Sequence, residues 1–308
     1  MANSDEISAR FWNLPWKADE ESERENTFID DIIQKTHIER LITENLDGVE
    51  TAFDGGAGYG RFSMLLAGRG IRVTHFDISQ PMIDKARALA EERGVAGNMT
   101  FVLGSLEDLS AFHDAQFDLV MSFDAPISYT YPNQGDVVKN LARIAKKRLI
   151  ISVYSRMAWP AHAFDPAQKV KYLLDESRDP WNSLGEVSKL AEYKPDMAAV
   201  REFFRTGLTE PAESTGAAFE AGGTPWPISY AFMPDELRGL LESCGGRNIR
   251  LSGPGALSRL IPGEVLRNIM RDAQLRGDFL DFCYEYDRNP SVAGLGKDNL
   301  VALAEIGE

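Results

Sequence analysis

The chain has 308 residues, 44% of them hydrophobic and 26% charged, which is ordinary for a globular protein. Its formal net charge of −14 argues against nucleic acid or an anionic membrane as the main partner, because both select basic surfaces. We find neither a secretory signal nor an apolar run of about 18 residues, and the two cysteines lack metal-ligand spacing, so we expect a cytoplasmic protein.

The N-terminal part predicts helix outside the main sheet. Residues 9–26 mix polar and aromatic side chains and end in an acidic run. From Phe28 to Ile42 apolar residues recur at the spacing of one helix face, with His37 nearby. We expect residues 1–45 to form a helical segment that covers a binding site.

Five short apolar runs then alternate with helical patterns. We expect these strands at 49–53, 71–76, 99–103, 117–123 and 148–153. The fourth run is almost continuously apolar, which is typical of a strand buried on both faces of a parallel sheet. Ser79 can cap the helix that follows the second strand, with Pro81 in its first turn. This order predicts a doubly wound α/β core over residues 46–154.

The alternation stops after the fifth strand. Residues 155–230 carry helical patterns between Pro-, Gly- and Trp-rich connections and are predicted to cover the substrate. Strands at 247–251 and 298–306 return to the sheet, with a second helical insertion at about 254–297. We therefore expect residues 231–308 to complete a seven-stranded, mostly parallel sheet.

The stretch from Val49 to Arg61 joins the first strand, a glycine-rich turn and the start of a helix. Glycine lets the backbone approach a ligand closely, and the helix N-terminus offers unpaired N–H groups, so this unit predicts a nucleotide-cofactor loop. The dinucleotide fingerprint G-x-G-x-x-G does not fit. Its third glycine would fall on Arg61 when counted from Gly56, and on Ser63 when counted from Gly58.

The pattern present is instead Asp54-x-Gly56-x-Gly58-x-Gly60, with the acid closing the strand. A carboxylate there would repel a pyrophosphate and attract a cationic cofactor such as a sulfonium. Asp54 as a simple turn acid is the alternative interpretation.

With these residues the chain resembles the class I S-adenosylmethionine-dependent methyltransferases over most of its length. The resemblance implies a Rossmann-like fold with a reversed last strand and S-adenosyl-L-methionine as the cofactor. It also implies that Asp54, Gly56, Gly58 and Gly60 hold the methionine part of that cofactor.

The resemblance assigns further cofactor contacts. Asp77, which closes the second strand, matches the acid that binds the ribose hydroxyls, and Met82 matches the residue that packs on adenine. Ser105-Leu-Glu-Asp-Leu stands where the family commonly has Asp-Ala-x-Asp-Leu, so Ser105 and the backbone of Leu106 are the matching adenine contacts. A helix-capping role for Asp77 and a core-filling role for Met82 stay open.

The segment after the fourth strand matches the family's acceptor side. There the resemblance implies that Asp124 and Tyr129 orient or deprotonate the acceptor and that Ser128 binds it. Tyr154, just past the fifth strand, has the same standing as a substrate-binding residue. A turn held by Pro126 and capped by Asp124 is the alternative.

The histidines differ by position. His162 follows the fifth strand on the ligand side and is the best histidine for a general base. His37 could face the substrate or be structural, whereas we expect His75 in the core and His113 exposed at the opposite edge. Trp159 belongs to the tryptophans of the covering segments, which predict a partly apolar acceptor cavity.

We therefore predict a cytoplasmic biosynthetic enzyme that methylates a small molecule on O, N or C by in-line transfer. It needs no metal, and a homodimer is left open. Asp124-Ala-Pro-Ile lacks the second proline and the aromatic residue of the Asp-Pro-Pro-Tyr-type amide-methylating motif. Methylation of an adenine or glutamine nitrogen is therefore less expected. The alternatives are a non-catalytic S-adenosylmethionine-binding regulator and an NAD(P)-dependent oxidoreductase, which the failed fingerprint disfavours.

Overall fold

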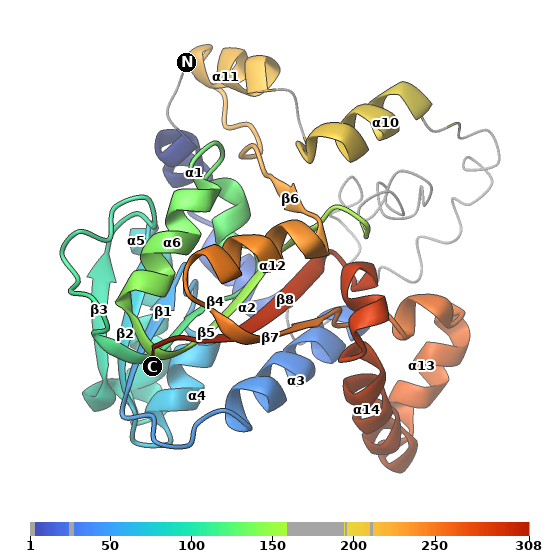
Figure 1. The fold of residues 1–308 in the computed structure, drawn as a ribbon, viewed down its shortest axis with the longest axis horizontal. Coiled ribbons are helices and arrows are strands. Elements are labelled where there is room, and N and C mark those ends of the chain that lie inside the picture. Colours follow the sequence, from blue (N-terminus) through green and yellow to red (C-terminus); the bar gives the residue numbers. More distant parts are fainter. Residues whose placement is uncertain (1–3, 25–27, 159–193, 195, 210–211, 308) are drawn as a thin grey trace.

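The computed structural model describes residues 4–24, 28–158, 194, 196–209 and 212–307, and a mixed sheet runs through their centre (Figure 1). The sheet has the order β3-β2-β1-β4-β5-β8-β7, with the short β6 beside β5. Its strands are β1 (Thr51–Gly55), β2 (Arg72–Asp77), β3 (Met99–Leu103), β4 (Phe117–Ser122), β5 (Ala145–Ser155), β6 (Ala231–Phe232), β7 (Arg247–Ser252) and β8 (Asn299–Glu305).

The strand directions confirm the predicted topology. The pairs among β1 to β5 are parallel, whereas β8 runs antiparallel to both β5 and β7. Every residue of β4 is buried, as its apolar run indicated. All seven predicted strands are present, and the two-residue β6 is an addition that the sequence pattern did not reveal. The parallel arrangement brings the carboxyl ends of β1, β2 and β4 to one edge.

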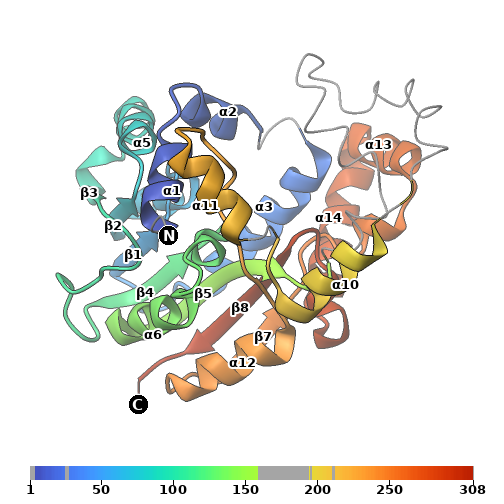
Figure 2. The same ribbon diagram turned by 90° about the horizontal axis from the view of Figure 1, so that it is seen from above.

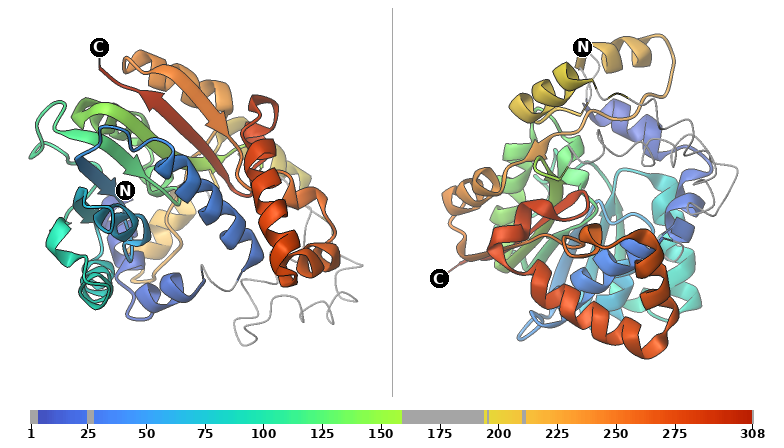
Figure 3. Two further views of the ribbon diagram at one scale, coloured as in Figure 1. Left: turned by 90° about the horizontal axis from the view of Figure 1, so that it is seen from below. Right: turned by 90° about the vertical axis from the view of Figure 1, so that its right-hand side faces the viewer.

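Helices cover both faces of the sheet (Figures 1 and 3). On one face lie α6 (Gln134–Ile144) and α12 (Pro234–Ser243), which contact each other. On the other face lie α3 (Ile29–Thr43), α4 (Arg61–Ala67) and α5 (Gln80–Glu92). Helix α14 (Ala273–Asp287) packs along α3 and follows α13 (Gly263–Arg271). Short 3-10 turns lie at η1 (Ala96–Asn98), η2 (Pro126–Tyr129), η4 (Ser258–Leu260) and η5 (Pro290–Leu295).

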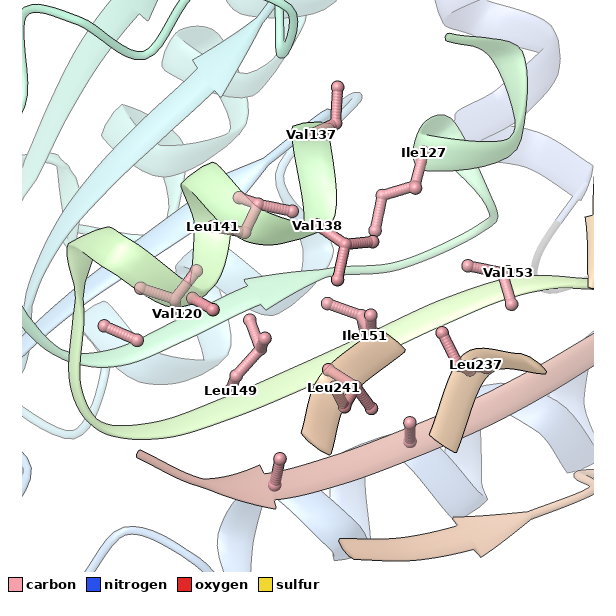
Figure 4. Close-up of a cluster of buried hydrophobic side chains, with 14 of the residues drawn as sticks. Val120, Ile127, Val137, Val138, Leu141, Leu149, Ile151, Val153, Leu237 and Leu241 are labelled. Atoms are coloured by element: carbon pink, nitrogen blue, oxygen red, sulfur yellow. The ribbon is translucent and has the colours of Figure 1, made fainter. Parts of the chain in front are cut away.

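Two apolar layers hold these helices on the sheet. Figure 4 shows part of the first layer, in which Leu141 of α6 and Leu241 of α12 lie over Leu149 and Ile151 of β5. The second layer joins α3 and α4 to the opposite face of the same strands. Leu149 and Ile150, neighbours on β5, belong to different layers because successive strand residues point to opposite faces.

Among the described residues, four helices lie outside this core. Residues 4–24, here named the N-terminal cover, form α1 (Ser4–Trp12) and α2 (Lys17–Arg24), in a segment for which we expected helix without defined bounds. Helices α10 (Met197–Thr206) and α11 (Ala212–Glu220) both lie within residues 155–230, where helical patterns were expected. Figure 2 shows α1 beside α11, and the Arg10 guanidinium donates to the carbonyls of Phe219 and Gly223. No helix within the described ranges combines the length and apolar character needed to cross a membrane.

Candidate active site

The glycine loop leaves the end of β1 and turns into α4. Gly56, Gly58 and Gly60 have φ values of 66°, 55° and 86°, in the left-handed region that favours glycine. A Cβ on Gly56 would lie 2.5 Å from Pro126, whereas a Cβ on Gly58 would meet no atom within 4 Å. The loop is thus tightly packed at Gly56 and open at Gly58, so the backbone at Gly58 is the part that a ligand can approach.

Asp77 fixes this loop against the start of α5. One carboxylate oxygen accepts the backbone N–H of Gly58 at 2.7 Å, and the other accepts that of Ser79 at 2.8 Å. Ser79 in turn caps α5, with its hydroxyl accepting the N–H of Met82. The capping role that the sequence left open for Asp77 is therefore present, and its carboxylate also reaches the cleft described next.

Two adjacent compartments form a cleft above the loop. They share the lining residues Trp12, Gly56, Ile78, Pro126 and Tyr129. The first compartment is lined in addition by the predicted residues Asp54, Gly58, Asp77, Met82 and Asp124. The second is lined by Ser105 and Leu106, at the end of β3. The structure thus brings most of the predicted cofactor residues into one cleft at the carboxyl edge of the sheet.

Carboxylates dominate the first compartment. Burial raises the pKa of Asp54 to about 7; a hydrogen bond from Ser63 lowers it, and the charge of Asp77 raises it. Burial also raises the pKa of Asp77 to about 6, against the lowering effect of its bonds to the Ser79 and Gly58 backbone. Asp124 and Glu21 line the same compartment. Because buried carboxylates are stabilised by a nearby positive charge, this cleft fits a cationic ligand such as a sulfonium cofactor.

A buried lysine fixes Asp124. The Lys35 ammonium on α3 forms an ion pair with the Asp124 carboxylate, and the two side chains are 1% and 37% exposed. Its nitrogen also lies 5.4 Å from the centroid of the Phe62 ring. Asp124 and Ala125 both have left-handed backbone angles, at φ 65° and 61°, which are strained for residues other than glycine. The ion pair therefore anchors a strained turn at the wall of the cleft.

Aromatic rings close the cleft from the side of the N-terminal cover. Trp12 packs edge-on against Tyr129, and Trp226 contacts both rings. The Tyr129 hydroxyl bonds to that of Tyr154, and Tyr154 itself lines neither compartment. Tyr129 thus lines the cleft, while Tyr154 lies behind it.

Other predicted residues lie outside the cleft lining. Ser128 is fully buried, and its hydroxyl accepts the backbone N–H of Tyr154 at 2.9 Å. Gly60 opens α4, where a Cβ would lie 3.1 Å from that of Ala86, so its role is in packing. His162 and Trp159 fall outside the described residues, and their assignments stay predictions.

His37 requires a correction. It lies inside the fold, 2% exposed, with Nε2 3.1 Å from the Ser252 hydroxyl and its ring edge-on to Tyr284. Burial lowers its pKa to about 3, helped by the charges of Arg288 and Arg40. It lines neither compartment, because the side of α3 that carries it faces β7 and α14. His75 is buried and His113 is exposed, as predicted.

Sequence reasoning missed three residues around the acids. Lys35 was overlooked because a lysine on a helix usually lies in water, and its only signal was its place among the apolar residues of α3. Ser63 lies beneath Asp54, and its hydroxyl bonds to that carboxylate at 2.6 Å. His75 lies 3.0 Å from the same hydroxyl. The pairing of these side chains depends on tertiary structure and leaves no spacing signal.

Comparison with known proteins agrees with this geometry. Residues 52–148 match the family model described as a methyltransferase domain. The magnesium-protoporphyrin O-methyltransferase of Synechocystis is 34% identical over 109 residues, which cover 35% of this chain and 45% of that protein. The tRNA 5-carboxymethoxyuridine methyltransferase of Escherichia coli is 31% identical over 84 residues, which cover 27% of this chain and 32% of that protein. The matches thus span less than half the length of both relatives.

Among solved structures, the phosphoethanolamine N-methyltransferase 2 of Haemonchus contortus superposes with a TM-score of 0.53 at 15% identity. The superposition covers 99% of this chain and 61% of that one, and at this identity it bears on the fold alone. The strand order, the acidic glycine loop and the matching family model lead to one assignment. Residues 52–148 thus form a methyltransferase domain of the class I S-adenosylmethionine-dependent type, whose cofactor is S-adenosyl-L-methionine.

Proposed function

We propose that this protein transfers a methyl group from S-adenosyl-L-methionine to a small-molecule acceptor. The observation that carries the proposal is the gathering of Asp54, Asp77 and Asp124 in one cleft with Tyr129 at its wall. When bound, the cofactor supplies a methyl group on a cationic sulfur. The chain has to attract that cation, align the acceptor with it and exclude water.

The proposed roles follow the two compartments. Asp54 and the Gly56–Gly58 backbone hold the amino-acid end of the cofactor, and Asp77 with Met82 holds the ribose and one face of adenine. Ser105 and Leu106 line the adenine end. Alignment of this kind can contribute about 7–11 kcal/mol in ideal cases, so a general base is an addition rather than a requirement.

On the acceptor side we propose that Asp124 and Tyr129 orient or deprotonate the acceptor. Ser128 and Tyr154 support Tyr129 from behind, through the hydroxyl pair and the Tyr154 N–H bond. A general base would add about 10²–10⁴-fold if the acceptor carries a proton of low acidity. His162 remains a candidate for that role on its sequence position alone.

A small acceptor with an oxygen nucleophile is our favoured substrate class. The relative from Synechocystis is named as an O-methyltransferase, which supports oxygen as the acceptor atom. The relative from Escherichia coli is named for a tRNA nucleoside, but the net charge of −14 disfavours a nucleic-acid partner here. Cys244 and Cys283 are free thiols, which supports the cytoplasm as the compartment.

Calorimetric titration tests the cofactor half of this proposal. We expect micromolar or tighter binding of S-adenosylmethionine and of its demethylated product, and no binding of NAD or NADP. Binding of neither adenosyl compound would contradict the proposed function, and binding of NAD(P) would revive the oxidoreductase. Turnover then separates an enzyme from a regulator. A panel of small carboxylic acids, alcohols, phenols and amines is screened for release of the demethylated cofactor, with Asp54→Ala as the inactive control.

We further propose that residues 1–45, 155–230 and 254–297 form the roof over a core of residues 46–154 completed by 231–308. The N-terminal cover supports this, because it bonds to residues beside the cofactor loop. Ser79 Oγ donates to the Trp12 carbonyl at 2.9 Å, and Ser105 Oγ donates to Asp5 at 2.7 Å. The two compartments measure about 110 and 50 Å³, less than the roughly 300–1,000 Å³ usual for ligand sites. The cover therefore has to shift to admit the cofactor.

Replacing Trp12 by alanine should speed release of the demethylated cofactor about tenfold. Trp12 lines both compartments, and truncating a central aromatic contact commonly costs more than about 1 kcal/mol. Stopped-flow displacement measures the rate. Trp16→Ala is the matched control, because Trp16 lies in the same segment, is 52% exposed and lines neither compartment. Equal release rates in the two variants would show that the N-terminal cover does not contact the bound cofactor.

A further inference from the structure

A chain of three buried polar side chains runs beneath the glycine loop. Ser63 of α4 donates its hydroxyl proton to Asp54 of β1 at 2.6 Å. The same oxygen lies 3.0 Å from Nδ1 of His75 on β2. Asp54 is 2% exposed, and Ser63 and His75 are not exposed at all.

The number of available protons decides which group donates in each of these two hydrogen bonds. A serine hydroxyl has one proton, so while Asp54 is ionised and accepts from Ser63, the Ser63 oxygen must accept from Nδ1–H of His75. His75 is then the neutral tautomer protonated on Nδ1, and burial lowers its pKa to about 4, which keeps the ring neutral near pH 7. Its other nitrogen, Nε2, makes no hydrogen bond of normal geometry within the described part of the chain, although the Gly58 backbone lies close enough to the ring to raise the His75 pKa against the effect of burial.

A side chain that only filled the core would not need these hydrogen bonds or a polar ring. A buried ring nitrogen without a partner costs about 1–3 kcal/mol, and an apolar side chain would avoid that cost. The ring also lies directly under the loop, since a Cβ on Gly60 would lie 3.4 Å from both Nδ1 and Cε1 of His75. The imidazole is therefore located where it can act on the ligand-facing acid.

We propose that Ser63 and His75 are positioning residues that hold the Asp54 carboxylate toward the ammonium of the cofactor's amino-acid end. This inference rests on the proposed function, in which Asp54 contacts that end. His75 orients the Ser63 hydroxyl, and the hydroxyl bond both fixes one oxygen of Asp54 and favours its ionised form. Removing either link leaves the acid in place but less ionised and less well oriented.

Two ligands separate this role from a structural one. S-adenosylhomocysteine carries the ammonium, whereas 5′-methylthioadenosine has the same nucleoside and sulfur but lacks the amino-acid end. In Ser63→Ala, calorimetry should show S-adenosylhomocysteine binding weakened about tenfold or more, since a hydrogen bond to a charged group contributes about 1.5–3 kcal/mol. Binding of 5′-methylthioadenosine should change less than about twofold. His75→Leu should resemble Ser63→Ala, and His75→Asn, which retains an N–H donor, should restore most of the affinity.

The controls make each outcome decisive. Ser122→Ala removes another fully buried hydroxyl, one without a partner in the described residues, and should leave both ligands unaffected. If Ser63→Ala does not fold, the comparison of His75→Asn with His75→Leu gives the same information. Equal losses for the two ligands, or no loss for either, would overturn the proposal. If the unchanged protein binds neither ligand, the proposed function fails instead.

Discussion

Asp54→Asn should bind S-adenosylmethionine at least about thirtyfold more weakly, while the ligand-free variant is more stable than the unchanged protein at pH 8. The affinity falls because the variant loses a buried charge that faces a cation, and truncation of such a pair costs about 2–5 kcal/mol. The asparagine still accepts the Ser63 hydroxyl and has nearly the same shape, so the loop itself should persist. Calorimetry measures the affinity and urea unfolding the stability.

The gain in stability follows from the sign of the pKa shift. Burial raises the pKa of Asp54 to about 7 in the folded state, above the ordinary value of 3.8 that applies after unfolding. The folded protein therefore binds the proton more tightly, and stability from this group is lost as the pH rises to about 7. Between pH 5.5 and pH 8 the advantage of Asp54→Asn should grow by about 2 kcal/mol, at about 1.36 kcal/mol per pKa unit. A constant difference across this range would contradict the raised pKa.

Ligand binding should show the complementary pH dependence. The cation favours the ionised acid, so the unchanged protein must lose a proton from Asp54 on binding when the pH lies below about 7. Its affinity for S-adenosylmethionine should fall by about an order of magnitude from pH 7.5 to pH 6, and Asp77 should steepen the decrease at lower pH. Asp54→Asn should lack most of this dependence. If both proteins give parallel profiles, Asp54 is a turn acid and the cleft charge lies elsewhere.

The sequence was sufficient for the fold because its signals are local. Apolar runs, glycines and the Ser79 cap each specify a strand end or helix start within a few residues. Asp54 and Asp77 could be singled out because both stand at the carboxyl ends of parallel strands, where ligands bind in such sheets. β6 was missed because two residues carry no periodicity.

The failures concern partners that only the folded chain brings together. His37 and Lys35 lie two residues apart on α3, yet one packs against Ser252 and the other pairs with Asp124. Both side chains are buried, but a two-residue offset turns them about 200° apart on the helix, so they meet different neighbours that the spacing alone does not identify. Ser63 was visible in the sequence only as a failed glycine of a dinucleotide fingerprint.

Replacing Asp124 should lower the stability of the protein more than replacing Lys35. Asp124→Asn removes the carboxylate beside an ammonium that is 1% exposed, and breaking a buried pair in this way costs about 3–5 kcal/mol. Lys35→Met should cost less, because the remaining carboxylate is 37% exposed and reaches the cleft. The double variant Lys35→Met/Asp124→Asn should recover much of the loss, since neither charge is left. Urea unfolding of the four proteins gives the coupling energy.

An exposed pair provides the matched control. Lys139 and Asp136 of α6 are 59% and 74% exposed, so Asp136→Asn should change stability by less than about 1 kcal/mol. If Asp124→Asn is as mild as Asp136→Asn, the Lys35 pair does not anchor the strained turn at Asp124 and Ala125. That result would also mean that α3 does not hold the wall of the acceptor site in place.

Once an acceptor is known, the same variants show whether Asp124 acts as a general base in the reaction. Asp124→Asn alone is ambiguous, because a destabilised turn and a lost base both lower turnover. Lys35→Met keeps the carboxylate and the double variant removes it, and neither leaves the lysine charge buried. A base role predicts near-normal kcat in Lys35→Met and a loss of about 10²–10⁴-fold in the double variant. Equal kcat in the two would make Asp124 a structural acid and leave alignment by the cleft to carry the reaction.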